Sequence, residues 1–427
     1  MNMVVLALIG IGVMLVLMFL RMPVSFALVA IGLLGSAIVI GFEPALSMVA
    51  ADAFRQISSY GLSVVPLFVL MGQLAYRAGI SRRLYTAAYD WIGSLPGGLA
   101  ATSILASIGF SAVSGSNSAT TATMGSVALP EMKRYKYDPG FAGASVAVGG
   151  TLGVVIPPST ALIIIAIQSE QSITKLFTAA LVPGLIVGVV LVLTAILVAW
   201  RRPELGPRGP KVSWGARLRA LTGVIEVLIL FLLVIGGLAL GWFTPTEAGA
   251  VGAFGVLVTA LVTRQLTIKQ AWMATLESLR ISAMVLLLIA GAVMFGRFLS
   301  LTRLPFDLAE WAGGLAAPAV VVLLVILSIY LIGGAFMDAL GFLVISIPIF
   351  FPLVIALGYD PIWFTVIITL ITTIGAISPP VGVNVFVVSA MDKSIDVVKV
   401  FKGTIVYYIG YATCIALFIA FPAFIVR

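Results

Sequence analysis

Two apolar stretches of the sequence are each interrupted near the middle by small and polar residues. Residues 99–132 contain the run Ser114-Gly115-Ser116-Asn117-Ser118-Ala119-Thr120-Thr121, and residues 318–355 contain Gly333-Gly334-Ala335-Phe336-Met337-Asp338. Hydroxyl, carboxylate and backbone carbonyl oxygens are the ligands of hard cations, and free N–H groups at helix N-termini bind carboxylates. The two runs therefore indicate sites for a cation such as Na+ and for an organic anion.

Each interrupted stretch is followed by a second segment with its own break. The breaks are Gly149-Gly150-Thr151-Leu152-Gly153-Val154-Val155-Ile156-Pro157-Pro158 and Thr372-Thr373-Ile374-Gly375-Ala376-Ile377-Ser378-Pro379-Pro380. Proline removes a backbone donor and glycine permits non-helical dihedral angles. Unwound backbone at membrane depth is tolerated only where it is buried in protein or lines a cavity. Each half of the chain thus contains one pair of breaks, which predicts two related cation sites that flank one anion site.

Structural interpretations of the same residues exist. Small residues also allow helices to pack closely, and a proline pair can simply kink a helix. Duplication at matched positions favours the functional interpretation, because paired interrupted segments are typical of transporter binding sites. Asp338 is an acid within an apolar run, which is costly and marks function by default; a structural ion pair is its alternative.

Composition places the elements that carry these motifs in a membrane. Of 427 residues, 61% are hydrophobic and 9% are charged, too apolar a balance for one water-soluble core. Runs of about 20 apolar residues, the length of a membrane span, recur along the chain. The first run lacks a preceding basic stretch and is followed by Arg21-Met22-Pro23, so we expect a membrane helix there and not a signal peptide.

Several other classes of site are disfavoured by residue counts. The chain has one cysteine, Cys414, and no histidine, which leaves no disulfide framework, cysteine metal site or histidine-based chemistry. The formal charge of +8 comes from Lys and Arg in loops, where they set membrane topology, so nucleic acid is not implied.

The two halves of the chain repeat the same landmarks at a nearly constant spacing. Gly72 and Gly291 are 219 residues apart, as are Gly115 and Gly334, and the Tyr-Asp-Pro turns at 137–139 and 359–361 differ by 222. The first turn is surrounded by basic residues, whereas residues 355–363 contain none. Because cytoplasmic loops collect Lys and Arg, the two copies are predicted to be inverted repeats.

These observations predict an all-α polytopic membrane protein with about ten transmembrane helices and two re-entrant hairpins. The expected parts are N-terminal scaffold helices in 1–60; repeat 1 in 61–168, with hairpin 99–132 and broken helix 141–168; central scaffold helices in 169–279, with a cytoplasmic linker at 201–219; repeat 2 in 280–391, with hairpin 318–355 and broken helix 363–390; and a C-terminal helix in 392–427.

The sequence resembles the large permease subunit of the tripartite ATP-independent periplasmic (TRAP) transporters over essentially its whole length. The stretches that carry the resemblance are SGSNSATTATMGSVALPEMKRYKYDPGFA, GGTLGVVIPPS, GAFMDALGFLVISIPIFFPLV and ISPPVGVNVFV. The resemblance implies a multi-pass protein of the bacterial inner membrane that imports a small organic acid, such as a dicarboxylate, by sodium symport and an elevator mechanism. It also implies a small four-helix permease subunit and a periplasmic substrate-binding protein as partners, no enzymatic activity, and no cofactor besides the coupling ion Na+.

The resemblance also implies site residues. The first sodium site would consist of Ser114, Asn117, Gly150, Gly153, Val155 and Pro157. The second would consist of Gly334, Met337, Asp338, Thr372, Thr373 and Gly375. Substrate would be bound by Ser116, Ser118, Thr151, Ser378 and Asn384.

Other functions stay open to different degrees. A self-sufficient sodium-coupled carboxylate symporter, or an ion antiporter of related fold, is the alternative that the repeat alone does not exclude. An intramembrane serine protease would need a paired His or Lys at membrane depth, but the chain has no histidine and its lysines lie at loops and membrane edges. A P-loop pump would need the motif GxxxxGK[ST], which the sequence lacks. Sugar acids, C4-dicarboxylates and keto acids all fit as substrates.

Overall fold

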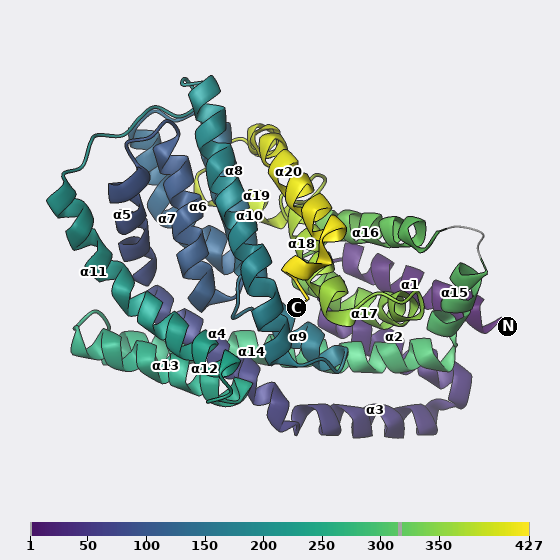
Figure 1. Cartoon of the computed structure of the whole chain (residues 1–427). Helices are drawn as coiled ribbons and strands as arrows, with labels where there is room; N and C mark the ends of the chain where they lie inside the picture. The colour runs from purple at the N-terminus through teal and green to yellow at the C-terminus, as the bar shows by residue number, and fades with distance from the viewer. Residues whose placement is uncertain (1, 315–317, 427) are drawn as a thin grey trace.

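The computed structural model describes residues 2–314 and 318–426, and in these ranges all regular structure is helical (Figure 1). The first half contains α1 (Met3–Phe19), α2 (Val24–Ile40), α3 (Phe42–Ile57), α4 (Val64–Arg77), α5 (Ile80–Ile92), α6 (Gly98–Ser114), α7 (Asn117–Arg134), α8 (Pro139–Val155), α9 (Thr160–Gln168) and α10 (Ile173–Arg201). The second half contains α11 (Trp214–Phe231), α12 (Gly237–Ala239), α13 (Pro245–Val262), α14 (Ile268–Leu301), α15 (Leu304–Gly313), α16 (Ala319–Phe336), α17 (Ala339–Ala356), α18 (Pro361–Gly375), α19 (Val383–Met391) and α20 (Val397–Ala420). The predicted all-α architecture is confirmed.

Membrane-spanning length is common among these helices. Within the described residues, eight helices are long and apolar enough to cross a bilayer, or nine if the bent pair Phe42–Ile57 and Tyr60–Arg77 is one span. Two of the eight, α16 and α17, are the arms of the predicted hairpin 318–355 and were not counted among the expected ten. α1 and α2, which were expected to span, have 17 residues each, the short end of the spanning range. The chain is a multi-pass membrane protein.

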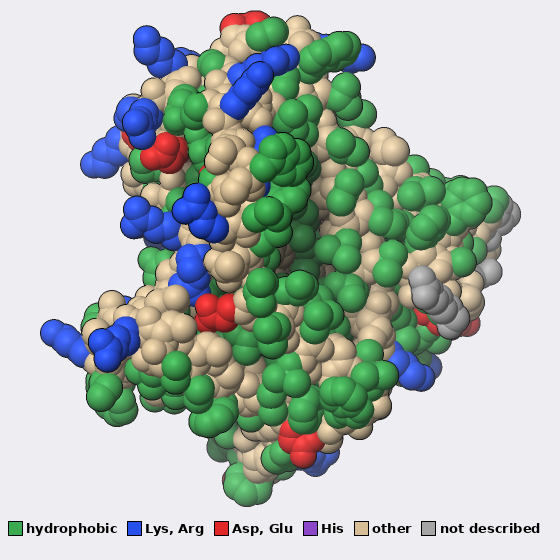
Figure 2. Space-filling model, turned by 60° about the vertical axis from the view of Figure 1, so that its left-hand side comes forward, with side chains coloured by type: hydrophobic (Ala, Val, Ile, Leu, Met, Phe, Trp, Pro, Cys, Tyr) green, Lys and Arg blue, Asp and Glu red, His purple; other side chains and the backbone are tan. Residues whose placement is uncertain are grey.

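The surface agrees with a lipid environment. On α10, Leu185, Val189, Leu193 and Leu197 are each about half exposed, and their four-residue spacing places them on one face of the helix. Figure 2 shows apolar side chains over much of the visible surface, with Lys and Arg gathered at its top and left. Such a division is typical of a membrane protein whose basic loops lie on one side.

The Tyr-Asp-Pro turns start corresponding helices in the two halves. Asp138 Oδ1 accepts a hydrogen bond of 2.9 Å from the Phe141 N–H at the start of α8. Asp360 Oδ1 accepts one of 2.9 Å from the Trp363 N–H at the start of α18. An aspartate N-cap followed by proline in the first turn is a strong helix start, so the repeated motif specifies the same local structure twice.

Helices of the two halves cross each other in matched pairs. α2 packs against α14, and α13 packs against α4. A Cβ added to Gly32 of α2 would lie 2.7 Å from the carbonyl carbon of Met294 in α14, and one added to Gly252 of α13 would overlap the sulfur of Met71 in α4. Gly32 and Gly252 are 220 residues apart, the spacing of the repeat. Small residues at both crossings therefore let the halves interlock.

Each repeat forms a helical hairpin beside a broken helix. The hairpins are α6–α7 and α16–α17, and the broken helices are α8–α9 and α18–α19. α8 packs against both arms of the first hairpin and α18 against both arms of the second. Figure 1 shows α6 and α7 on the left of the molecule and α16 and α17 on the right. The division of the chain into scaffold and repeat domains stays a prediction.

Candidate substrate and ion site

The tip of the first hairpin lies directly against the break between α8 and α9. The Gly115 carbonyl accepts hydrogen bonds from the Thr160 backbone N–H, at 3.2 Å, and from the Thr160 hydroxyl, at 2.8 Å. Gly115 has φ of +62°, and an added Cβ would lie 2.8 Å from the Pro158 carbonyl oxygen. Backbone conformation and close approach thus both require glycine at this tip.

The second hairpin repeats the arrangement. Its Ala335 carbonyl accepts hydrogen bonds from the backbone N–H groups of Val381 and Gly382, at 3.1 and 3.3 Å, just after the second proline pair. A Cβ added to Gly375 would overlap the backbone of Gly334. Each tip is therefore fastened by its carbonyl to the residues that follow a proline pair.

The broken helix of repeat 1 ends beside the first tip with two backbone carbonyls that have no helical partner. The helical partners of the Gly153 and Val154 carbonyls would be the N–H groups of residues 157 and 158, which are prolines and have none. No other group in the described part of the chain donates a hydrogen bond to these two carbonyls. The C-terminal, negative ends of α6 and α8 both lie at this break, an arrangement that favours a cation.

The structure brings together the residues predicted for the first sodium site. Ser114 and Asn117 flank the hairpin tip, while Gly150, Gly153, Val155 and Pro157 form the facing end of α8. With its amide nitrogen turned toward α8, Asn117 donates to the carbonyls of Gly150, at 3.3 Å, and Thr151, at 3.0 Å. The Ser114 and Thr120 hydroxyls are 2.6 Å apart. Whether Na+ binds to these atoms stays a prediction.

The residues predicted for the second sodium site also converge. Gly334 is so close to the Thr372 carbonyl that a Cβ would overlap it. The hydroxyls of Thr372 and Thr373 donate to carbonyls one turn earlier in α18, both at 2.7 Å, which leaves their oxygen lone pairs available. Met337 and Asp338 form the tip, and Asp338 Oδ2 accepts a hydrogen bond of 3.2 Å from the Leu340 N–H.

A cavity of about 580 Å³ lies between the two hairpin tips; we call it the tip cavity. It is bounded by the start of α7, by the tip of hairpin α16–α17, and by α4 and α14. Its polar side chains are those of Gln73, Tyr76, Arg77, Ser114, Ser116, Asn117, Ser118, Thr123, Thr160, Glu277 and Asp338. It is the point where both repeats present polar groups to one space.

Ser116 and Ser118, two of the five residues predicted to bind substrate, line the tip cavity. The other three make contacts inside the helix packing. The Thr151 hydroxyl is hydrogen-bonded to the Tyr411 hydroxyl of α20, the Ser378 hydroxyl donates to the Ile374 carbonyl at 2.8 Å, and the Asn384 amide donates to the Ala147 carbonyl of α8 at 3.0 Å. Their role in substrate binding stays a prediction.

Six polar residues of the tip cavity were not predicted as site residues from the sequence: Gln73, Tyr76, Arg77, Thr123, Thr160 and Glu277. Gln73 and Arg77 are on α4, and Glu277 is on α14. The buried Nε of Arg77 has no hydrogen-bond partner within the described residues. A signal was present: residues 69, 72, 73, 76 and 77 all line the cavity, and this spacing of three and four marks one face of a helix.

An ion pair at the far end of α7 joins the first hairpin to the segment that follows repeat 2. Lys133 Nζ is 3.0 Å from Asp392 Oδ2, in the segment between α19 and α20. Hydrogen bonds from Ser394, and then the bond and charge of Lys133, lower the pKa of the Asp392 carboxyl to about 2. The carboxylate is therefore ionised throughout the physiological range, and the pair links α7 to the segment before α20.

Comparison with known proteins assigns the chain to a family. The family described as "Tripartite ATP-independent periplasmic transporter, DctM component" matches residues 11–424. The chain belongs to this family. It is 36% identical over 364 residues to the C4-dicarboxylate TRAP transporter large permease protein DctM of Pseudomonas aeruginosa, covering 85% of each chain. The predicted TRAP large permease is confirmed, and these relatives are named as transporter permeases and not as enzymes.

A longer relative and a solved structure add to the comparison. The chain is 35% identical over 370 residues to the isethionate TRAP transporter permease protein DctMQ of Oleidesulfovibrio alaskensis, covering 85% of this chain and 58% of that protein. Its fold resembles the crystal structure of the Alcanivorax borkumensis YdaH transporter, with a TM-score of 0.63, 15% identity and 98% coverage of both chains. At that identity the likeness concerns the fold alone.

Proposed function

We propose that this TRAP large permease imports a small organic acid together with Na+ across the bacterial inner membrane. The observation that carries the proposal is the tip cavity, where polar groups of both hairpins and the Arg77 guanidinium line one space. Relatives named for C4-dicarboxylate and for isethionate support a small organic anion as substrate.

The tip cavity offers the groups that hold a carboxylate. Arg77 supplies a guanidinium, which binds carboxylates with two parallel hydrogen bonds. α7 begins at the cavity, with Ser116 as its N-cap, and the positive end of its dipole favours an anion. Ser118 adds a hydroxyl. A carboxylate between Arg77 and the start of α7 is the binding mode we propose.

Sodium would bind beside the cavity at the two breaks. The unpartnered carbonyls of Gly153 and Val154 and the oxygens around Asp338 are hard ligands of the kind that Na+ accepts. Both sites adjoin a hairpin tip, so an ion bound there would hold the tip against its broken helix. Ion binding would thereby shape the substrate cavity.

Charge neutralisation provides a physical basis for coupling. Moving an uncompensated carboxylate through the membrane interior is costly. Two or more Na+ ions would neutralise Asp338 and the substrate carboxylate, so that the hairpins and broken helices could cross only when loaded, moving elevator-fashion against α2, α4, α13 and α14. The sodium gradient would then drive import.

Two partner proteins belong to the proposal. The family is described as tripartite and periplasmic, which supports a periplasmic binding protein that delivers substrate and a small four-helix permease subunit that braces the scaffold. The relative named DctMQ, of which this chain covers 58%, is long enough to contain a further subunit. Substrate choice would rest with the binding protein.

The test is uptake into proteoliposomes that contain this chain and its candidate small subunit. The candidate binding protein is first screened against organic acids, beginning with succinate, by thermal shift, and the acid that stabilises it is radiolabelled. We expect uptake that requires the binding protein, the small subunit and an inward Na+ gradient, and that collapses when K+ replaces Na+.

Two other results would redirect the assignment. Sodium-driven uptake without the binding protein would favour a self-sufficient symporter. Uptake that ignores the Na+ gradient, with all three components shown to be folded and assembled, would contradict sodium coupling.

A further inference from the structure

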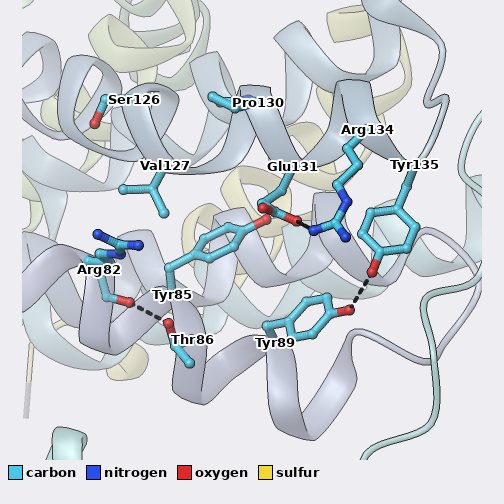
Figure 3. Close-up of a pocket in the computed structure, with 10 residues that line it drawn as sticks. All are labelled: Arg82, Tyr85, Thr86, Tyr89, Ser126, Val127, Pro130, Glu131, Arg134 and Tyr135. Atoms are coloured by element: carbon cyan, nitrogen blue, oxygen red, sulfur yellow. Dashed lines mark hydrogen bonds and ion pairs between the residues drawn. The ribbon is translucent and has the colours of Figure 1, made fainter.

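One face of α7 continues beyond the tip cavity. Ser116, Ala119, Ala122 and Thr123 line the tip cavity. Ser126, Val127, Pro130, Glu131 and Arg134 line a second cavity of about 610 Å³ (Figure 3). Their spacing of three and four residues places all nine on the same side of the helix. Most are small or polar, unlike the large apolar residues that face lipid on α10.

The facing wall is also continuous along the chain. α4 contributes Gln73, Tyr76 and Arg77 to the tip cavity, and α5 contributes Arg82, Tyr85 and Tyr89 to the second cavity. Figure 3 shows the α5 side chains facing those of α7 across this space. Arg82 also lines a third cavity of about 520 Å³, whose lining includes Ala78, the residue after Arg77.

Charge changes sign along this route. The tip cavity contains Arg77 as its basic residue and Glu277 and Asp338 as its acidic residues. The second and third cavities contain Arg82, Arg83, Arg134 and Arg219, against Glu131 alone. Arg83 is paired with Glu226 at 2.9 Å, whereas Arg82 and Arg219 form no ion pair within the described residues.

We propose that this face of α7 lines a water-filled passage, the α7 passage, through which the transported anion leaves the hairpin tips for the cytoplasm. The proposal rests on the proposed function. Once Na+ has left Asp338, acidic groups outnumber basic groups in the tip cavity and repel the anion. The excess of arginine at the outer end attracts it, because clefts lined by one sign of charge concentrate ions of the other.

Cysteine labelling tests the passage without any need for transport. In a Cys414→Ser background, single cysteines replace Ala122 in the tip cavity, Ser126 in the second cavity, and Ala128, which is fully buried off this face. Inside-out vesicles of the complex are treated with an anionic sulfonatoethyl or a cationic trimethylammonioethyl methanethiosulfonate. The rate at which each reagent modifies each cysteine is divided by the rate at which the same reagent modifies a free thiol in solution, so that the intrinsic reactivity of the reagent cancels.

We expect A122C and S126C to react and A128C to stay unreactive. The ratio of anionic to cationic rates should be about tenfold higher at S126C than at A122C, within the range of electrostatic focusing. Arg82→Gln with Arg219→Gln should bring the two ratios to within about twofold of each other. Lys211→Gln, an exposed change in the linker, should leave both ratios unchanged.

Two results would overturn the α7 passage: an A122C thiol as unreactive as A128C, or charge ratios that are equal at A122C and S126C. Because labelling is independent of uptake, the two proposals can fail separately. The expected labelling pattern without sodium-driven uptake would contradict the proposed function alone. Sodium-driven uptake without the labelling pattern would contradict the passage alone.

Discussion

Asn117 connects the tip of the first hairpin to the broken helix behind it. Its side chain is buried, and its amide donates to two carbonyls near the end of α8, those of Gly150 and Thr151. Both carbonyls lie within α8, where the N–H groups four residues later are their helical partners, so each bond from the amide adds about 0.5–1.5 kcal/mol. The residue therefore holds two segments together at the site where a cation would bind.

Replacing Asn117 by Ala should destabilise the protein. We expect a loss of about 1–3 kcal/mol for two hydrogen bonds of about 0.5–1.5 kcal/mol each, seen as a lower unfolding temperature by scanning fluorimetry in detergent. Asn2→Ala is the matched control, because Asn2 caps α1 at an exposed position, where it accepts from the Val4 N–H. Equal effects of the two substitutions would show that Asn117 has no special role at the tip.

Asn117 could be predicted as a site residue from the sequence, whereas Arg77 could not. The polar run around Asn117 interrupts an apolar stretch, so its composition alone marks it. Arg77 ends an ordinary amphipathic helix and is followed by further arginines, which makes it look like a loop residue that sets topology. Only the packing of α4 against the first hairpin shows that its side chain enters a cavity.

The hairpins and broken helices depend on glycines at their contacts. The contact between Gly153 of α8 and the first tip is so close that an added Cβ would overlap the Ser116 carbonyl and lie 2.7 Å from the Thr120 hydroxyl. The overlap cannot be relieved by rotating a flexible side chain, because the nearest atoms are backbone. The tip would have to move away from the break.

We expect Gly153→Ala to reduce uptake at least tenfold, because it displaces carbonyls proposed to bind Na+. Gly12→Ala in α1 is the control, since an added Cβ there meets nothing within 4 Å. Initial rates are compared in proteoliposomes at equal amounts of assembled complex. Normal sodium-driven uptake by the Gly153→Ala variant would argue against ion binding at this break.

The positions of the helix breaks could be predicted because glycine and proline impose them locally. The packing of α2 against α14 and of α13 against α4 could not be predicted, because the sequence of an apolar helix does not specify which helix it packs against. Gly32 and Gly252 are separated by the spacing of the repeat, yet a single glycine in an apolar run can be present for many structural reasons. The close contacts at these glycines show which one applies.

The chain as a whole presents both repeats to one cavity, and Asp338 is where the second repeat contributes a carboxylate. Asp338 and Asp360 both cap helices of repeat 2, accepting hydrogen bonds from Leu340 and Trp363. Only Asp338 lines the tip cavity. Asparagine keeps a side-chain acceptor at an N-cap and removes the charge, so the two positions separate capping from ion binding.

The most direct test of sodium coupling at this cavity is the sodium dependence of uptake by the Asp338→Asn and Asp360→Asn variants. Initial rates are recorded against external Na+ in proteoliposomes that contain the complete complex. We expect Asp338→Asn to lose at least tenfold in sodium-driven uptake and to respond weakly to Na+, while Asp360→Asn behaves as the parent protein. An unchanged Na+ response in Asp338→Asn would contradict the proposal that this cavity couples sodium to the transported acid.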